Sequence, residues 1–195
     1  MFRRAYPSIA AALLCALLGG TATAQISTAL PPQTIGTLSA DQPEPTELQQ
    51  VQKLMAAGRH EQALKRADAQ LAKNPRDAQM RFVRGVILTE LKQPAEAREV
   101  FQRLTEEFPE LPEPYNNLAV LYASEGKLDN ARAALQMALA AAPNYGTAYE
   151  NLGDVYLQMA ADAYQRASTL EPGNKQATAK LTLSRELISK TRGPR

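Results

Sequence analysis

The chain has 195 residues, a length that fits one domain of ordinary size. It carries 22 basic and 20 acidic residues, so its formal net charge is only +2, and it has a single cysteine and a single histidine. These numbers exclude a strongly basic nucleic-acid-binding chain and a small scaffold held together by disulfides.

Residues 1–24 have the pattern of a secretory signal peptide. Arg3 and Arg4 precede an apolar run at 9–18 that is too short to span a bilayer, and a small-x-small cleavage site ends at Ala24. We therefore expect cleavage after Ala24 and a periplasmic protein. An uncleaved signal is the alternative, and it would be the only attachment to a membrane.

Cleavage would change the composition of the mature chain. The only cysteine, Cys15, would leave with the signal; a lipid on Cys15 is disfavoured because Leu14 before it is not small. The loss of Arg3 and Arg4 lowers the basic count from 22 to 20, which equals the 20 acidic residues. We expect no disulfide, no thiolate ligand and no nucleic-acid partner.

Residues 25–45 follow as a proline-rich leader, with serine, threonine and glycine between the prolines. Such a segment has no periodic apolar face, so we expect a flexible, partly extended stretch. A tether or a short recognition segment is the alternative.

From Thr46 the sequence repeats with a period of about 34 residues. Each unit predicts two amphipathic helices with a short break between them and a proline after the second. Thr46 and Gln49 form a capping box, and Asp77 is a predicted N-cap. Three series keep the period: Pro75, Pro109 and Pro143; Ala63, Ala97 and Ala131; and the turn residues Gly58, Lys92 and Gly126.

These landmarks resemble the tetratricopeptide repeat family. The resemblance implies an all-α helix–turn–helix solenoid over 46–172, with repeats at about 46–77, 78–111 and 112–145 and a shortened fourth at 146–173. The third unit carries the signature at Tyr115, Leu118, Ala119, Tyr122, Ala131, Leu135, Ala138 and Pro143, the second at Gly85, Leu88, Ala97, Phe101 and Pro109, and the first at Leu54, Ala63 and Pro75.

The fourth unit has lost its turn. The interval from Pro143 to Pro172 is five positions shorter than the interval from Pro109 to Pro143, and the missing residues lie between Tyr156 and Ala160. We predict one long helix over about 146–170, because the apolar residues stay in helical phase through the gap. The predicted apolar stripe is Tyr149, Leu152, Tyr156, Ala160, Ala163, Ala167 and Leu170.

A last helix is predicted over 174–190, followed by a tail at 191–195. Its stripe of Ala177, Leu181, Ser184 and Ile188 should fold back on the long helix and cap the stack, since a solenoid needs a more polar end unit. Loss of the turn without functional effect is one interpretation of the long helix. A dimerisation or docking face is the other.

Support for catalysis in the sequence is weak, and no enzyme activity, cofactor or metal is predicted. His60 lies in an inter-helix turn and is expected to pack against its neighbours. The chain has no histidine pair with metal-ligand spacing and no glycine-rich phosphate loop. Five tyrosines could form a binding platform, but their spacing assigns most of them to the packing of the stack: Tyr115, Tyr122, Tyr149, Tyr156 and Tyr164.

In this family the first helices of the repeats line a concave groove. The resemblance therefore implies a peptide groove formed by the outward residues Gln79, Phe82, Val86, Thr89, Glu113, Asn116, Val120, Glu150, Asn151 and Asp154. An apolar strip rimmed by polar groups suits an extended or helical peptide. Some members hold a C-terminal carboxylate with Lys, Arg and Asn. Here Asn117 and Asn151 occupy one such place, but the basic residues are absent.

The predicted function is a non-enzymatic periplasmic adapter that grips a segment of another envelope protein. The first alternative is a self-association module that forms a homodimer through the long helix and the C-terminal helix. The second is an enzyme or a carbohydrate-binding accessory. The adapter hypothesis predicts that Phe82→Asp or Val120→Asp leaves the fold intact and abolishes partner capture.

Overall fold

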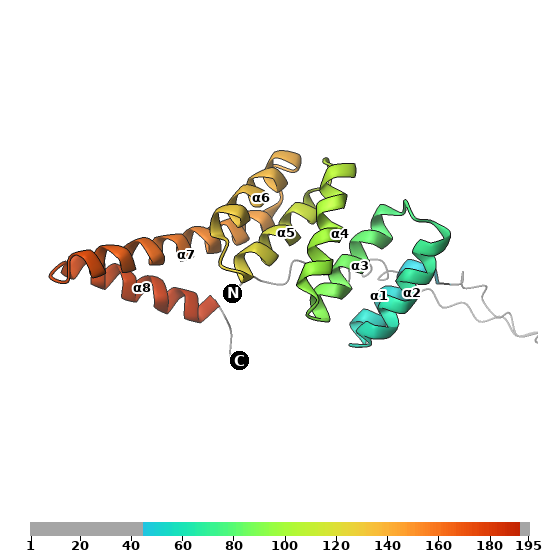
Figure 1. Cartoon of the computed structure of the whole chain (residues 1–195), viewed down its shortest axis with the longest axis horizontal. Helices are drawn as coiled ribbons and strands as arrows, with labels where there is room; N and C mark the ends of the chain where they lie inside the picture. The colour runs from blue at the N-terminus through green and yellow to red at the C-terminus, as the bar shows by residue number, and fades with distance from the viewer. Residues whose placement is uncertain (1–44, 192–195) are drawn as a thin grey trace, which may run out of the picture.

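The computed structural model describes residues 45–191, and this part of the chain contains only helices, which confirms the predicted all-α class. The helices are α1 (Glu47–Ala56), α2 (His60–Lys73), α3 (Ala78–Glu90), α4 (Pro94–Glu107), α5 (Pro112–Ser124), α6 (Leu128–Ala141), α7 (Gly146–Leu170) and α8 (Lys175–Thr191). Figure 1 shows α1–α6 as a row of stacked hairpins, with α7 running on beyond the row and α8 folded back along it. The predicted signal peptide and the leader up to residue 44 lie outside the described residues.

Local sequence signals fix where several helices begin. The side chain of Thr46 accepts from the backbone N–H of Gln49 at 3.2 Å, and the side chain of Gln49 accepts from the backbone N–H of Thr46 at 2.8 Å, which confirms the capping box. Asp77 caps α3 as predicted, accepting a backbone N–H at 2.9 Å. Pro94 and Pro112 are the first residues of α4 and α5. The missing N–H of proline costs no hydrogen bond there, because the N–H groups of a first turn have no partner within the helix.

The turns of the first three repeats share one backbone geometry. Gly58, Lys92 and Gly126 have φ angles of 71°, 62° and 75°. This left-handed region carries no steric penalty for glycine but costs free energy for a residue with a Cβ. The periodic series of turn residues therefore marks a common turn, which the middle repeat closes with a lysine.

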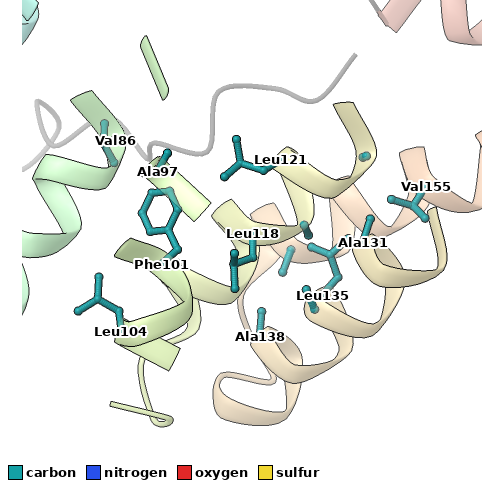
Figure 2. Packing of buried hydrophobic residues seen from close by; sticks show 14 of the residues in the cluster. Val86, Ala97, Phe101, Leu104, Leu118, Leu121, Ala131, Leu135, Ala138 and Val155 are labelled. Carbon is teal, nitrogen blue, oxygen red and sulfur yellow. The ribbon is translucent and has the colours of Figure 1, made fainter. Parts of the chain in front are cut away.

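Small residues let the helices of each hairpin approach closely. A Cβ added at Gly85 on α3 would lie 2.7 Å from the ring of Phe101 on α4, and that ring is fully buried. Ala97 and Ala131 are also fully buried at helix contacts. Figure 2 shows the resulting core around Phe101 and Leu135, and this core extends from α3 to α7. A second cluster joins α1, α2 and α3.

The long fourth-repeat helix is present as predicted. α7 runs for 25 residues without interruption. The predicted apolar stripe is nevertheless not its buried face, because Tyr149, Tyr156 and Leu170 are 55%, 48% and 82% exposed. In a complete repeat the second helix folds back over the first, whereas here it continues along the same axis and leaves the stripe uncovered. The buried residues of α7 are Ala148, Asn151, Val155 and Ala161.

The last helix packs against α7. Its buried side chains are Ala177, Leu181 and Ser184, with Ile188 half-buried, and these form the predicted stripe. Leu183 and Leu187 lie outside the stripe and are 65% and 50% exposed. α8 therefore covers one face of α7 and carries exposed apolar residues of its own.

Candidate functional site

The predicted groove lies on α3, α5 and α7, the first helices of the second, third and fourth repeats. α5 contacts α7 directly, and α1 contacts α3. Of the ten predicted residues, Gln79 and Glu150 are exposed, five are half-buried and three are buried. The half-buried residues are Phe82, Thr89, Glu113, Val120 and Asp154.

The outward placement of three predicted residues is wrong. Val86, Asn116 and Asn151 are 2%, 0% and 1% exposed, so their side chains belong to helix contacts. Asn151 of α7 donates through its amide nitrogen to Oδ1 of Asn116 of α5 at 2.8 Å. Asn117 donates to the backbone carbonyl of Glu113 at 2.8 Å. Because Asn117 and Asn151 are 3% and 1% exposed, they do not form an open carboxylate clamp.

Phe82 combines surface exposure with a structural role. Its ring lies 5.7 Å from that of Phe101, centroid to centroid, and the residue packs against both core clusters. Because it joins the two clusters, Phe82→Asp would disturb the fold as well as the surface. This packing argues against the expectation that the substitution leaves the fold intact. Thr89 is half-buried, and its hydroxyl donates to the backbone carbonyl of Gly85 on the same helix at 3.0 Å.

The predicted groove residues include three acids, of which Glu150 is exposed and Glu113 and Asp154 are half-buried. Burial raises the pKa of Asp154, and the carboxylate of Glu150 raises it further. Tyr145 lies just before α7, and burial together with the negative charge of Glu113 raises its pKa to about 12. The pKa of Tyr145 thus responds to the acid on α5, and that of Asp154 to the acid on its own helix. Sequence periodicity missed Tyr145, because it lies in a loop before the helix begins.

The remaining chemistry of the described residues is sparse. His60 begins α2 and is half-buried, and its Nδ1 has no hydrogen-bond partner within residues 45–191. Among those residues no group of three or more His, Cys, Asp or Glu side chains could hold a metal ion. None of the described helices is long and apolar enough to cross a membrane.

The tyrosines divide into two groups. Tyr115 and Tyr122 are half-buried against the core, as the packing prediction requires, and the Tyr115 hydroxyl donates to the carbonyl of Thr105 at 3.3 Å. Tyr149 and Tyr156 are exposed, so the packing prediction is wrong for them. Tyr164 is half-buried, with the Lys180 ammonium 5.5 Å from its ring centre.

Two family models, both described as tetratricopeptide repeat, match residues 48–112 and 88–153. The chain belongs to the tetratricopeptide repeat family. A relative from Arabidopsis thaliana, the tetratricopeptide repeat domain-containing protein PYG7, chloroplastic, is 40% identical over 73 residues. That match covers 35% of this chain and 24% of the relative, so the chain spans about a quarter of the relative's length.

Several solved structures have a similar fold. MamA has a TM-score of 0.52 at 23% identity, with 70% of this chain and 82% of MamA covered. pilF of Pseudomonas aeruginosa has a TM-score of 0.54 at 20% identity, with 75% and 68% covered. The first tetratricopeptide domain of Spaghetti (RPAP3), bound to the HSP90 peptide SRMEEVD, has a TM-score of 0.55 at 17% identity, with 58% and 90% covered. Similarity at these identities shows the fold alone.

Proposed function

We propose that this protein is a non-enzymatic adapter that binds a basic, partly apolar segment of another protein along α3, α5 and α7. The observation that carries the proposal is that α3, α5 and α7 together present exposed or half-buried acids and half-buried apolar side chains. Glu113, Glu150 and Asp154 supply negative charge, and Phe82 and Val120 supply apolar contact. Such a surface matches an extended or helical peptide with lysine or arginine beside its apolar anchors.

The proposed charge of the partner follows from the groove itself. The peptide bound by Spaghetti (RPAP3), SRMEEVD, carries acids near its C-terminus. An acidic tail of that kind would be repelled by Glu113 and Asp154 here, and like charges at an interface cost affinity and specificity. The same argument that favours a basic segment therefore disfavours an acidic one.

The proposed location is the periplasm, reached through a signal peptide cleaved after Ala24. The support is the sequence of residues 1–24, with its two arginines, short apolar run and small-x-small site. The proposed partner is accordingly a protein of the cell envelope.

A peptide titration tests the adapter proposal. The probe is a fluorescein-labelled amphipathic helix of leucine and lysine, and the reference is the same peptide with glutamate for lysine. We expect the basic peptide to bind at least tenfold more tightly at low salt. Glu113→Gln with Asp154→Asn should remove most of that preference, whereas Glu99→Gln with Glu106→Gln, which removes the same charge from α4, should not. Equal binding of both peptides to the native protein would contradict the proposal.

A second candidate function, self-association through α7 and α8, is favoured by a separate observation. Tyr149, Tyr156, Leu183 and Leu187 are each about half exposed or more, at 55%, 48%, 65% and 50%. Large exposed apolar side chains gathered on one pair of helices are typical of a protein-binding face.

A further inference from the structure

The first half of α7 carries an open face at a repeat position that is covered in the two preceding repeats. Gly85, Ala119 and Gly153 occupy one repeat position in three successive repeats. In the second repeat the ring of Phe101 fills this place, 2.7 Å from where a Cβ of Gly85 would lie, and Ala119 in the third is fully buried. A Cβ on Gly153 would meet nothing within 4 Å.

The tyrosines on either side of this position show the same contrast. Tyr115 and Tyr122 of the third repeat are half-buried against the core. Their equivalents, Tyr149 and Tyr156, are 55% and 48% exposed. We call Tyr149, Gly153 and Tyr156 the open socket, since the same positions in the third repeat are covered.

The side chains that would fill the open socket are on the same helix. Phe101 corresponds to Leu135 in the third repeat and to Tyr164 in the fourth, once the five missing positions of the fourth repeat are counted. Tyr164 is therefore the residue expected to lie over Gly153. At a rise of about 1.5 Å per residue, a straight helix places these two residues about 16 Å apart along its axis. One chain with an uninterrupted α7 cannot bring them together.

The second half of α7 and α8 present a matching face. The Lys180 ammonium lies over the Tyr164 ring at one edge of the α7–α8 contact, and the Arg185 guanidinium donates to the side chain of Gln165 at the other edge. Leu183 and Leu187 follow Lys180 by three and seven residues, so they lie on the Tyr164 side of α8. Both leucines are at least half exposed. The apolar residues of the two helices thus gather on one side.

We propose that two copies of the chain exchange the second halves of their fourth repeats. Tyr164 of each copy packs over Gly153 of the other, with the two α7 helices antiparallel, and each α8 travels with its own α7. This inference rests on the proposed self-association and specifies its geometry. Each copy gives the other the same contact that it receives, so the two copies form a closed twofold dimer. The twofold axis passes near residues 158–159, midway between Gly153 and Tyr164. A shortened hinge between two elements of one unit is a recognised route to such an exchange.

The first test is the mass of the full chain, expressed with its own leader, measured by light scattering over a range of concentrations. We expect a dimer, and we expect Tyr156→Glu to raise its dissociation constant at least tenfold. The matched control is Met137→Glu on α6, which is 51% exposed. Met137 corresponds to Arg103 of the second repeat. The side chain of Arg103 is 63% exposed even though a complete third repeat packs after it. Completing the fourth repeat should therefore leave Met137 outside the interface.

The second test restores the missing turn. Replacing residues 157–159 by the eight residues 123–130 of the third repeat returns the fourth repeat to the full length of the others. Each chain can then close its own hairpin, and we expect a helical monomer by circular dichroism and light scattering. A native chain that stays monomeric at all concentrations would overturn both self-association and exchange. A native dimer that survives Tyr156→Glu, or that survives the restored turn, would overturn the exchange alone.

Discussion

Replacement of Gly85 by alanine tests whether close packing or helix propensity has the larger effect on stability at this position. In an exposed helix interior, alanine is more favourable than glycine by about 1 kcal/mol. At Gly85 the added Cβ would lie 2.7 and 2.8 Å from two ring carbons of Phe101, which is fully buried. Overpacking of a well-packed core costs about 1–3 kcal/mol. We expect a net loss of up to about 2 kcal/mol in the free energy of unfolding.

The assay is urea denaturation followed by circular dichroism, at a concentration where the protein is monomeric. Gly153→Ala is the matched control, because it occupies the same repeat position and its Cβ would meet nothing within 4 Å. In the monomer we expect this control to gain about 1 kcal/mol from helix propensity alone. If Gly85→Ala stabilised the protein as much as Gly153→Ala, the close approach of Phe101 would not explain the glycine.

Three further predictions concern single positions. Lys92→Gly should raise the free energy of unfolding by about 1 kcal/mol in thermal melts, because Lys92 has a φ of 62°; a decrease would show that its side chain stabilises the turn. Asn116→Ala should lower the free energy of unfolding, measured in urea, by about 1–3 kcal/mol, because it leaves the buried amide nitrogen of Asn151 unpaired. Replacing both asparagines by leucine should cost less than the sum of the two single leucine replacements. Folding raises the pKa of Tyr145 from 10.0 to about 12, so its phenol ionises at a lower pH in the unfolded chain than in the folded one. Stability should therefore fall as the pH rises from 10 to 12. Tyr145→Phe should make this fall smaller in alkaline denaturation.

Sequence periodicity predicted the helices well because each repeat carries its own signals. The proline and turn series located the hairpins, and the unbroken apolar phase across residues 157–159 predicted a continuous α7. Periodicity states which residues share a face, but not which element covers that face. This is why Tyr149 and Tyr156 were assigned to the core although they are exposed. The outcome depended on the path of the chain after Tyr156, which is a tertiary property.

The proposed groove stays a prediction, but the structure corrects which of its residues are open to solvent. Assigning outward residues by repeat position treats every first helix as equally separated from the next. The contact between α5 and α7 instead buries Asn116 and Asn151 in a shared hydrogen bond. Glu150 is exposed and Glu113 and Asp154 are half-buried, so these three acids supply the charge of the proposed surface. Helix separation depends on both partners at once, so one repeat's sequence does not reveal it.

The most direct test of the proposed groove is a map of amide chemical shifts in the ¹⁵N-labelled protein as the leucine–lysine helical peptide is added. We predict that the perturbed amides cluster around Gln79, Glu113 and Asp154, on the first helices of three successive repeats. Glu113→Gln with Asp154→Asn should abolish the changes at those positions. Perturbations confined to α4 and α6, or to Tyr149, Tyr156 and the exposed face of α8, would contradict peptide binding in the groove.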